Sequence, residues 1–168
     1  MKPILLQFVC EKAISSQVIA WFSAGHFSHV DALLEDGTLL GARSDRVGGQ
    51  PPGVQIRPPN YINFSRRVVM AIPATDAQNT NFHAFLRRQL GKPYDSEAIW
   101  AFLFNRDWRE TDSWICSELQ AAGLEHAAIT PRLYLAANKI TPVSLALAAS
   151  AIGGVAAKAS SVSDGLPE

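Results

Sequence analysis

The side chains of this chain that are best suited to nucleophilic chemistry are those of two cysteines and four histidines. A cysteine attacks as its thiolate, so a catalytic cysteine needs surroundings that ionise it below the pKa of about 8.5 of a free thiol. The pattern around Cys116 predicts a helix capped by Asp112 or Ser113, which places the sulfur in the first turn. Unpaired amides and the positive end of the helix dipole favour a negative sulfur there, and the same amides can bind an oxyanion. Cys10 falls within an apolar strand, where we expect an inert thiol.

A general base must accompany the cysteine, and the candidates are His26, His29, His83 and His126. Only His29 begins a strand that is expected inside a sheet. We expect His83 to be a solvated residue beside the apolar face of a helix, and His26 to lie in a turn. His126 follows a helix end, where a cation is favourable for dipole reasons alone. Taken singly, each histidine is most simply a structural residue, and the pairing with Cys116 is what favours His29 as the base.

The second imidazole nitrogen of a catalytic histidine needs an acceptor that sets its tautomer. Asp31 is two residues from His29 and therefore on the same face of the predicted strand, about 6.6 Å away along it. That spacing permits electrostatic support and is long for a direct hydrogen bond. We therefore name Asp31 as the candidate orienting residue. A polar residue at the sheet rim is the simpler reading, and a backbone carbonyl or a water could orient the histidine instead.

A metal site is the alternative use of these residues, because His26, His29 and Asp31 form a His-x-x-His-x-Asp pattern. Residues three apart on a strand point to opposite faces, so the two histidines converge only if the chain bends between them. A zinc site that recruits Cys116 therefore stays the weaker hypothesis, and we predict no metal and no cofactor.

The elements that must position these side chains follow from the spacing of apolar residues. Asp36-Gly37 predicts a tight hairpin turn after the strand of His29. Gly91 is expected to cap one helix at its C-terminal end, and Gly123 is expected to end the helix that carries Cys116. We expect strands over residues 4–10, 29–34, 38–42, 54–57 and 67–72, and helices over 14–22, 75–90, 96–104, 114–122 and 143–149.

Length and composition predict one domain, because 168 residues with 48% hydrophobic content suffice for one core. We assign residues 1–152 to a single catalytic domain and 153–168 to a weakly anchored C-terminal tail. Basic and acidic residues number 15 each, so no net charge attracts nucleic acid. Two cysteines are too few for a disulfide scaffold, and both are expected to be free thiols. The sequence carries no signal for an oligomeric state.

The N-terminal apolar run, residues 3–10, is too short for a signal peptide. No uninterrupted apolar stretch approaches 18 residues, so we predict no transmembrane segment. The cytoplasm is therefore the expected compartment, with a periplasmic or phage-associated location as the alternative.

Three motifs occur in an order typical of one protein family: Phe27-Ser28-His29-Val30, Gly91-Lys92-Pro93-Tyr94-Asp95 and Ile115-Cys116-Ser117-Glu118-Leu119. Together they resemble the circularly permuted NlpC-type, papain-like cysteine hydrolases, which include YiiX-like proteins and relatives of lecithin retinol acyltransferase. The resemblance spans about residues 4–125. It implies an α+β fold in which an antiparallel sheet packs against helices. It also implies that the cysteine helix abuts the sheet and brings the sulfur to the imidazole.

The resemblance assigns further roles. The family usually supplies the third catalytic residue, commonly glutamate, from the strand after the hairpin, and the matching position here is Gly41, which has no side chain. It also places Tyr94 near the cleft, where it would contact substrate; the alternative is an aromatic residue that fills the turn between two helices. Trp114, together with Trp100, Phe102 and Phe104, could line an acyl pocket, although aromatic residues at helical spacing more often belong to a core.

We therefore predict a cysteine peptidase or amidase that forms an acyl-enzyme through Cys116 and His29. Its partner would be a peptide or acyl-amide substrate, such as a bacterial or phage cell-wall peptide. A lipid-directed acyltransferase or thioesterase of the same fold is the first alternative. A catalytically inactive binding module is the second, and Gly41 is the feature that favours it.

Overall fold

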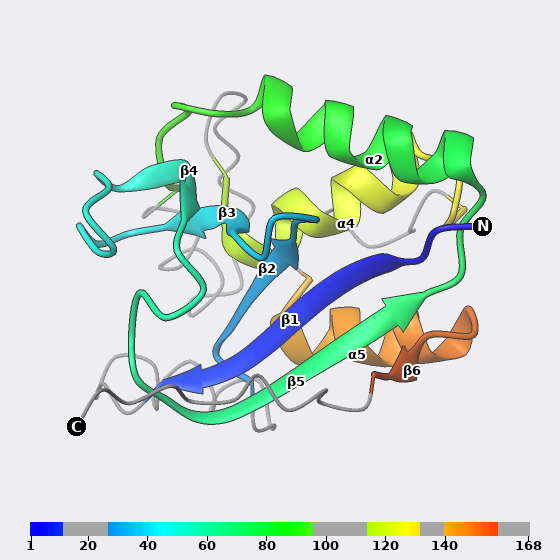
Figure 1. Ribbon diagram of the computed structural model, residues 1–168, viewed down its shortest axis with the longest axis horizontal. Helices are drawn as coiled ribbons and strands as arrows, with labels where there is room; N and C mark the ends of the chain where they lie inside the picture. The colour runs from blue at the N-terminus through cyan, green and yellow to red at the C-terminus, as the bar shows by residue number, and fades with distance from the viewer. Residues whose placement is uncertain (12–26, 96–113, 132–139, 158–168) are drawn as a thin grey trace.

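The computed structural model describes residues 1–11, 27–95, 114–131 and 140–157. Over these residues the chain forms one six-stranded antiparallel sheet with three helices (Figure 1). The fold class is therefore α+β, as the sequence predicts. The helices expected over 14–22 and 96–104 lie outside the described residues, as do His26, Trp100, Phe102 and Phe104.

The sheet runs in the spatial order β4-β3-β2-β1-β5-β6. Its central strand β1 pairs with β2 on one side and β5 on the other, which explains why Leu6, Gln7, Phe8 and Val9 are all fully buried. Gly37 has a φ of +81°, the conformation that the predicted turn between β2 and β3 requires. The strands are β1 (Ile4–Glu11), β2 (His29–Leu33), β3 (Leu39–Arg43), β4 (Gly53–Arg57), β5 (Phe64–Ile72) and β6 (Val155–Ala156).

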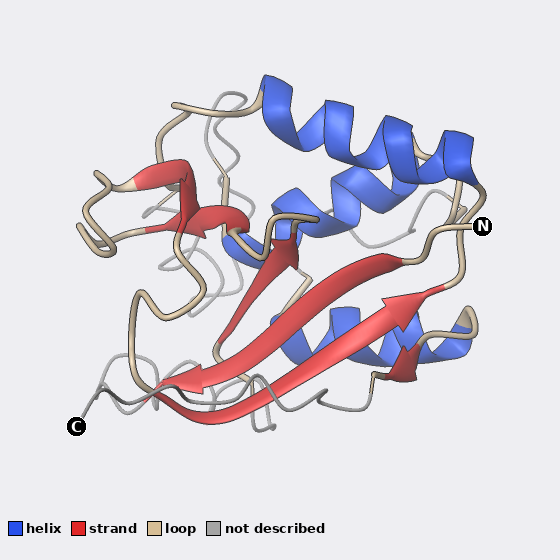
Figure 2. Ribbon diagram, in the orientation of Figure 1, coloured by secondary structure: helices blue, strands red, loops and turns tan. Residues whose placement is uncertain are grey.

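The described helices are α2 (Asp76–Arg88), α4 (Cys116–His126) and α5 (Pro142–Ala151). Helix α2 begins with a capping box between Thr75 and Gln78, and α5 begins with a cap from Thr141. Helix α4 packs on β2 and β3, α2 packs on α4, and α5 packs on β5 (Figure 2). All three helices contribute to a single hydrophobic core with the sheet. This arrangement brings the N-terminus of α4 to the strand of His29.

Three details differ from the sequence-based expectations. Gly123 does not end α4, which continues to His126. A Cβ at this position would stand 2.8 Å from the ring of Phe82, so the glycine allows α2 and α4 to cross closely. The C-cap of α2 is Gln89, and Gly91 follows in the left-handed region with a φ of +82°. Val155 and Ala156, within the stretch we assigned to the tail, pair with β5. None of the described helices has the length and apolar character that crossing a membrane requires.

Candidate active site

His29 is the first residue of β2, and the sheet fixes its position. The Ser28 amide donates to the Val9 carbonyl at 2.9 Å, and His29 lies directly opposite Val9 in the ladder between β1 and β2. The histidine is 6% exposed. A side chain on a buried, paired strand end has few alternative conformations, so the sheet holds the His29 imidazole in place.

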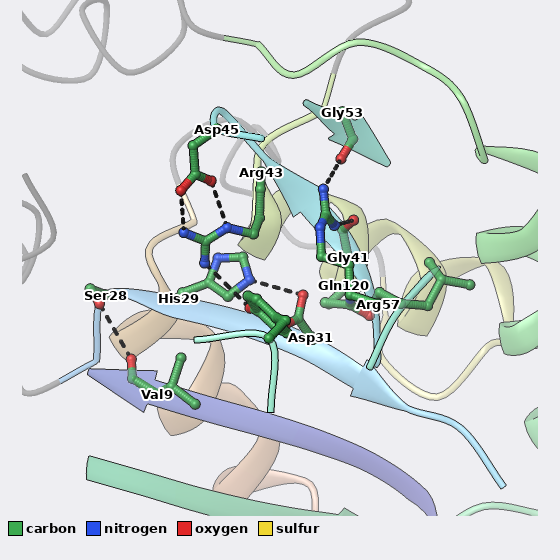
Figure 3. Close-up of polar contacts among 12 residues, drawn as sticks. Val9, Ser28, His29, Asp31, Gly41, Arg43, Asp45, Gly53, Arg57 and Gln120 are labelled. Atoms are coloured by element: carbon green, nitrogen blue, oxygen red, sulfur yellow. Dashed lines mark hydrogen bonds and ion pairs between the residues drawn. The ribbon is translucent and has the colours of Figure 1, made fainter. Parts of the chain in front are cut away.

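Asp31 makes the direct hydrogen bond that the strand spacing left in doubt. Its Oδ1 lies 2.9 Å from Nε2 of His29 (Figure 3), because the two side chains lean toward each other on one face of β2. Its Oδ2 accepts a hydrogen bond from the Tyr61 hydroxyl at 2.8 Å. Since Nε2 is engaged by the carboxylate, Nδ1 is the ring nitrogen left to serve a nucleophile.

Gly41 on β3 makes room for this carboxylate. A Cβ built on Gly41 would stand 1.8 Å from Oδ1 and 2.9 Å from Cγ of Asp31, which is far inside contact distance. Figure 3 shows Gly41 beside Asp31 on the neighbouring strand. The Asp31 carboxylate can therefore take its observed position only because residue 41 has no side chain.

Cys116 is the first residue of α4, whereas an N-cap at Ser113 would make it the third and one at Asp112 the fourth. The N-cap is Ile115, which makes no side-chain capping bond. The Trp114 amide donates to the Pro93 carbonyl, and the Trp114 carbonyl accepts from the Asp95 amide, both at 3.1 Å. These two bonds hold Trp114 in an extended conformation, so the helix cannot begin earlier. The sulfur still lies in the first turn, and the residue is 6% exposed.

The charges around His29 and Asp31 favour an ion pair between these two residues. Burial alone would lower the pKa of His29, but the Asp31 carboxylate, the charge of Cys116 and side-chain hydrogen bonds from both residues raise the pKa to about 10. Burial opposes ionisation of Asp31 as well, yet His29 and then the Tyr61 hydroxyl hold the pKa of that carboxyl below its usual value. The imidazole is therefore protonated at neutral pH between two acidic groups.

Tyr94 and Trp114, predicted to contact substrate, face each other in a parallel β-bridge, in which Trp114 forms backbone hydrogen bonds with Pro93 and Asp95 on either side of Tyr94. Burial and then the charge of Cys116 raise the pKa of Tyr94 well above its usual value, so the phenol stays neutral. The Trp114 indole turns instead toward α2, where its Nε1 donates to Gln89 at 3.2 Å and its ring meets Phe85 edge-on.

Of the described residues, His83, His126 and Cys10 lie outside the cluster of His29, Asp31 and Tyr61. His83 is half-buried on α2, and its Nδ1 is shielded from solvent, so the expectation of a solvated side chain is wrong for that atom. His126 in the last turn of α4 stacks on Phe85 and contacts Arg88. Cys10 is half-buried, and both cysteines are free thiols as predicted.

Two site residues escaped the sequence analysis. Tyr61 follows an irregular loop, and Arg43 ends β3, so neither belongs to a motif. Arg43 donates from Nη1 to the Tyr61 hydroxyl at 3.3 Å and is itself held by two hydrogen bonds to Asp45, of 2.7 and 3.0 Å. The sequence shows only that Tyr61 is a polar aromatic residue between two strands, and this does not indicate which residue its hydroxyl would contact.

Comparison with solved structures shows a YiiX-like fold. The chain is similar to a protein described as the metalloprotein YiiX from Escherichia coli O157:H7, DUF1105, with a TM-score of 0.55 and 20% sequence identity. The match covers 75% of this chain and 66% of that one. No family model matches the sequence, and no curated protein matches it either. Among the residues that the structure describes, no group of three or more His, Cys, Asp or Glu side chains is placed to hold a metal ion.

Proposed function

We propose that this protein is a cysteine hydrolase of the permuted papain type, with Cys116 as nucleophile, His29 as base and Asp31 as orienting acid. The observation that carries the proposal is the position of one imidazole: it is bonded to a carboxylate through Nε2 and interacts with a sulfur at the start of a helix. Thiol catalysis requires a nucleophile next to a base, and the base in turn is oriented by a third group.

The chemistry follows from these positions. The proton of the Cys116 thiol resides on His29, and the thiolate attacks the carbonyl carbon of an amide. The C–N bond then breaks, the His29 proton passes to the leaving amine, and a thioester to Cys116 remains. Water gives a proton to His29 as it attacks the thioester, which releases the acid and returns the proton to the thiolate–imidazole pair.

The start of α4 supplies the oxyanion site in this proposal. The first helical hydrogen bond in α4 joins the Leu119 amide to the Ile115 carbonyl at 3.1 Å. The amides of Cys116 and Ser117 precede it and face the end of the helix where negative charge is stabilised. A tetrahedral oxyanion formed on the cysteine would therefore meet amide donors without any rearrangement.

The inactive-module hypothesis loses its main support, because it rested on the missing acid at Gly41. Asp31 supplies a carboxylate to the imidazole from β2 instead. The zinc hypothesis is also weakened by the donor set: Nε2 of His29 bonds Oδ1 of Asp31, and Oδ2 of the same carboxylate accepts from Tyr61.

For substrate, we propose a peptide amide, such as that of a cell-wall stem peptide. An acyl group on a lipid or lipidated amine is the alternative within the same chemistry. Assays on murein peptides and on short-chain thioesters separate the two, since a peptidase cleaves the first and an acyltransferase or thioesterase consumes the second.

Thiol labelling tests the proposal without knowledge of the substrate. Iodoacetamide should modify Cys116 about tenfold or more faster than Cys10 near pH 7, because it reacts with thiolates. His29→Ala should slow labelling of Cys116 to the rate of an ordinary thiol, whereas Cys10→Ser should leave it unchanged. Equal and slow labelling of both cysteines in the folded protein would refute the proposal.

A further inference from the structure

The Asp31 carboxylate is held at both of its oxygens. Oδ1 bonds Nε2 of His29 at 2.9 Å, and Oδ2 accepts the Tyr61 hydroxyl at 2.8 Å. Asp31 is 2% exposed, so water is not available to replace either partner. Rotation of the carboxylate would break both bonds at once, and the hydroxyl of Tyr61 is therefore a restraint on the plane of the acid.

Tyr61 is in turn fixed by its own surroundings. The guanidinium of Arg43 donates to its hydroxyl and lies over its ring, 5.2 Å from the centroid. On another side the backbone of Gly48 approaches so closely that a side chain there would meet Cβ of Tyr61 at 2.7 Å. Phe64 contacts the ring edge-on at 5.8 Å. Tyr61 is only 9% exposed and is locked on all these sides.

We propose that Tyr61 is a positioning residue, which rests on the proposed hydrolase function: its hydroxyl fixes the Asp31 carboxylate, and through it keeps the His29 imidazole turned toward Cys116. The need for such a residue follows from the location of the acid. Asp31 shares a strand with His29 and faces Gly41 on β3, so residue 41 offers the carboxylate no side-chain partner.

The ionisation states agree with this role. Burial and then the Asp31 charge raise the pKa of Tyr61 far above its usual value, so the phenol is a neutral donor at neutral pH. The hydrogen bond from Tyr61 also contributes to the lowered pKa of Asp31. The donor and the ionised acceptor therefore coexist over the working pH range.

The variant Tyr61→Phe tests the proposal, because it removes one hydroxyl and keeps the ring. The readout is the alkaline limb of the pH profile for iodoacetamide labelling of Cys116, which reports loss of the His29 proton, together with the NMR titration of the His29 ring nitrogens. We expect both midpoints to fall by about one pH unit, since a loosened carboxylate stabilises the imidazolium less. We also expect kcat/KM to fall about tenfold.

Phe64→Leu is the matched control, because it removes the ring neighbour of Tyr61 and leaves the hydroxyl in place. It should lower the thermal midpoint without moving the pH profile. A folded Tyr61→Phe variant whose His29 midpoint equals that of the wild type would overturn the proposal, as would equal midpoint shifts in both variants.

The His29 titration also separates this proposal from the hydrolase function. If the wild type cleaves no amide, the midpoint shift in Tyr61→Phe still decides whether Tyr61 positions the acid. If Tyr61→Phe does not fold, the wild type answers the question: the Tyr61 hydroxyl proton should exchange slowly with solvent and show a nuclear Overhauser contact to Asp31. A rapidly exchanging hydroxyl would overturn the proposal.

Discussion

Oδ1 of Asp31 lies in the space that a side chain on residue 41 would occupy, 1.8 Å from the position of its Cβ. In the family that the sequence resembles, an acid on the strand after the hairpin orients the histidine. Here the acid stands on the strand of the histidine itself, and the neighbouring strand carries a glycine opposite. The carboxylate thus reaches the imidazole from a different residue, with a hydrogen bond of 2.9 Å.

Asp31→Asn should lower kcat/KM by about 10²–10⁴-fold while the fold persists, because the amide keeps the shape of the carboxylate and loses its charge. The pKa of His29, raised to about 10 mainly by Asp31 against the opposing effect of burial, should fall with it. Steady-state kinetics and the NMR titration of the His29 ring measure the two effects. An unchanged His29 midpoint in this variant would contradict the role we assign to Asp31.

Gly41→Ala should destabilise the protein by about 1–3 kcal/mol, because the new methyl group overlaps the Asp31 carboxylate. Denaturant unfolding of the single and double variants measures the coupling. In the Asp31→Ala background the same substitution should cost much less, since the atoms it meets are gone. Additive free energies in this double-mutant cycle would show that the two positions do not share one space.

The free energy of unfolding should fall as the pH rises from about 7 to 10.5. The pKa of His29 is raised from 6.5 to about 10 in the folded state, so its contribution is complete below pH 6.5 and is lost as the pH rises through 10. We expect a loss of about 2–4 kcal/mol. His29→Gln should show a shallower decline over the same range in urea titrations, and a decline as steep as that of the wild type would count against the ion pair.

Gly123→Ala should destabilise the protein although alanine is the better helix former. The methyl group would meet the Phe82 ring at 2.8 Å, and the overpacking cost of about 1–3 kcal/mol exceeds the gain of about 1 kcal/mol in helix propensity. In a Phe82→Leu background the overlap is relieved, and the same substitution should become neutral or stabilising. Thermal unfolding compares the two, and a stabilising effect in the wild-type background would disprove the close crossing of α2 and α4.

Local patterns predicted the elements that depend on local interactions. The hairpin at Gly37, the helix that starts near Thr75 and the strand of His29 follow from turn residues and apolar spacing, and the structure confirms all three. The same-face relation of His29 and Asp31 was also readable, because it depends only on the period of a strand. The direct bond between them was not, since strand spacing says nothing of how side chains lean.

Non-local contacts account for the errors. Ser113 is a good N-cap by type, but backbone hydrogen bonds of Trp114 across to the segment of Tyr94 keep the chain extended until Cys116. Gly123 is a helix breaker by propensity and is retained for packing against Phe82. Tyr61 is separated from Asp31 by 30 residues and a loop, and no spacing rule joins them.

The steric exclusion between positions 31 and 41 also constrains how such a site can change over time. A chain with any side chain larger than hydrogen at 41 cannot accept the present Asp31 conformation, because the two would collide. A substitution at position 41 therefore requires another side-chain conformation or another residue at position 31. The two positions are expected to vary together among proteins that share this sheet.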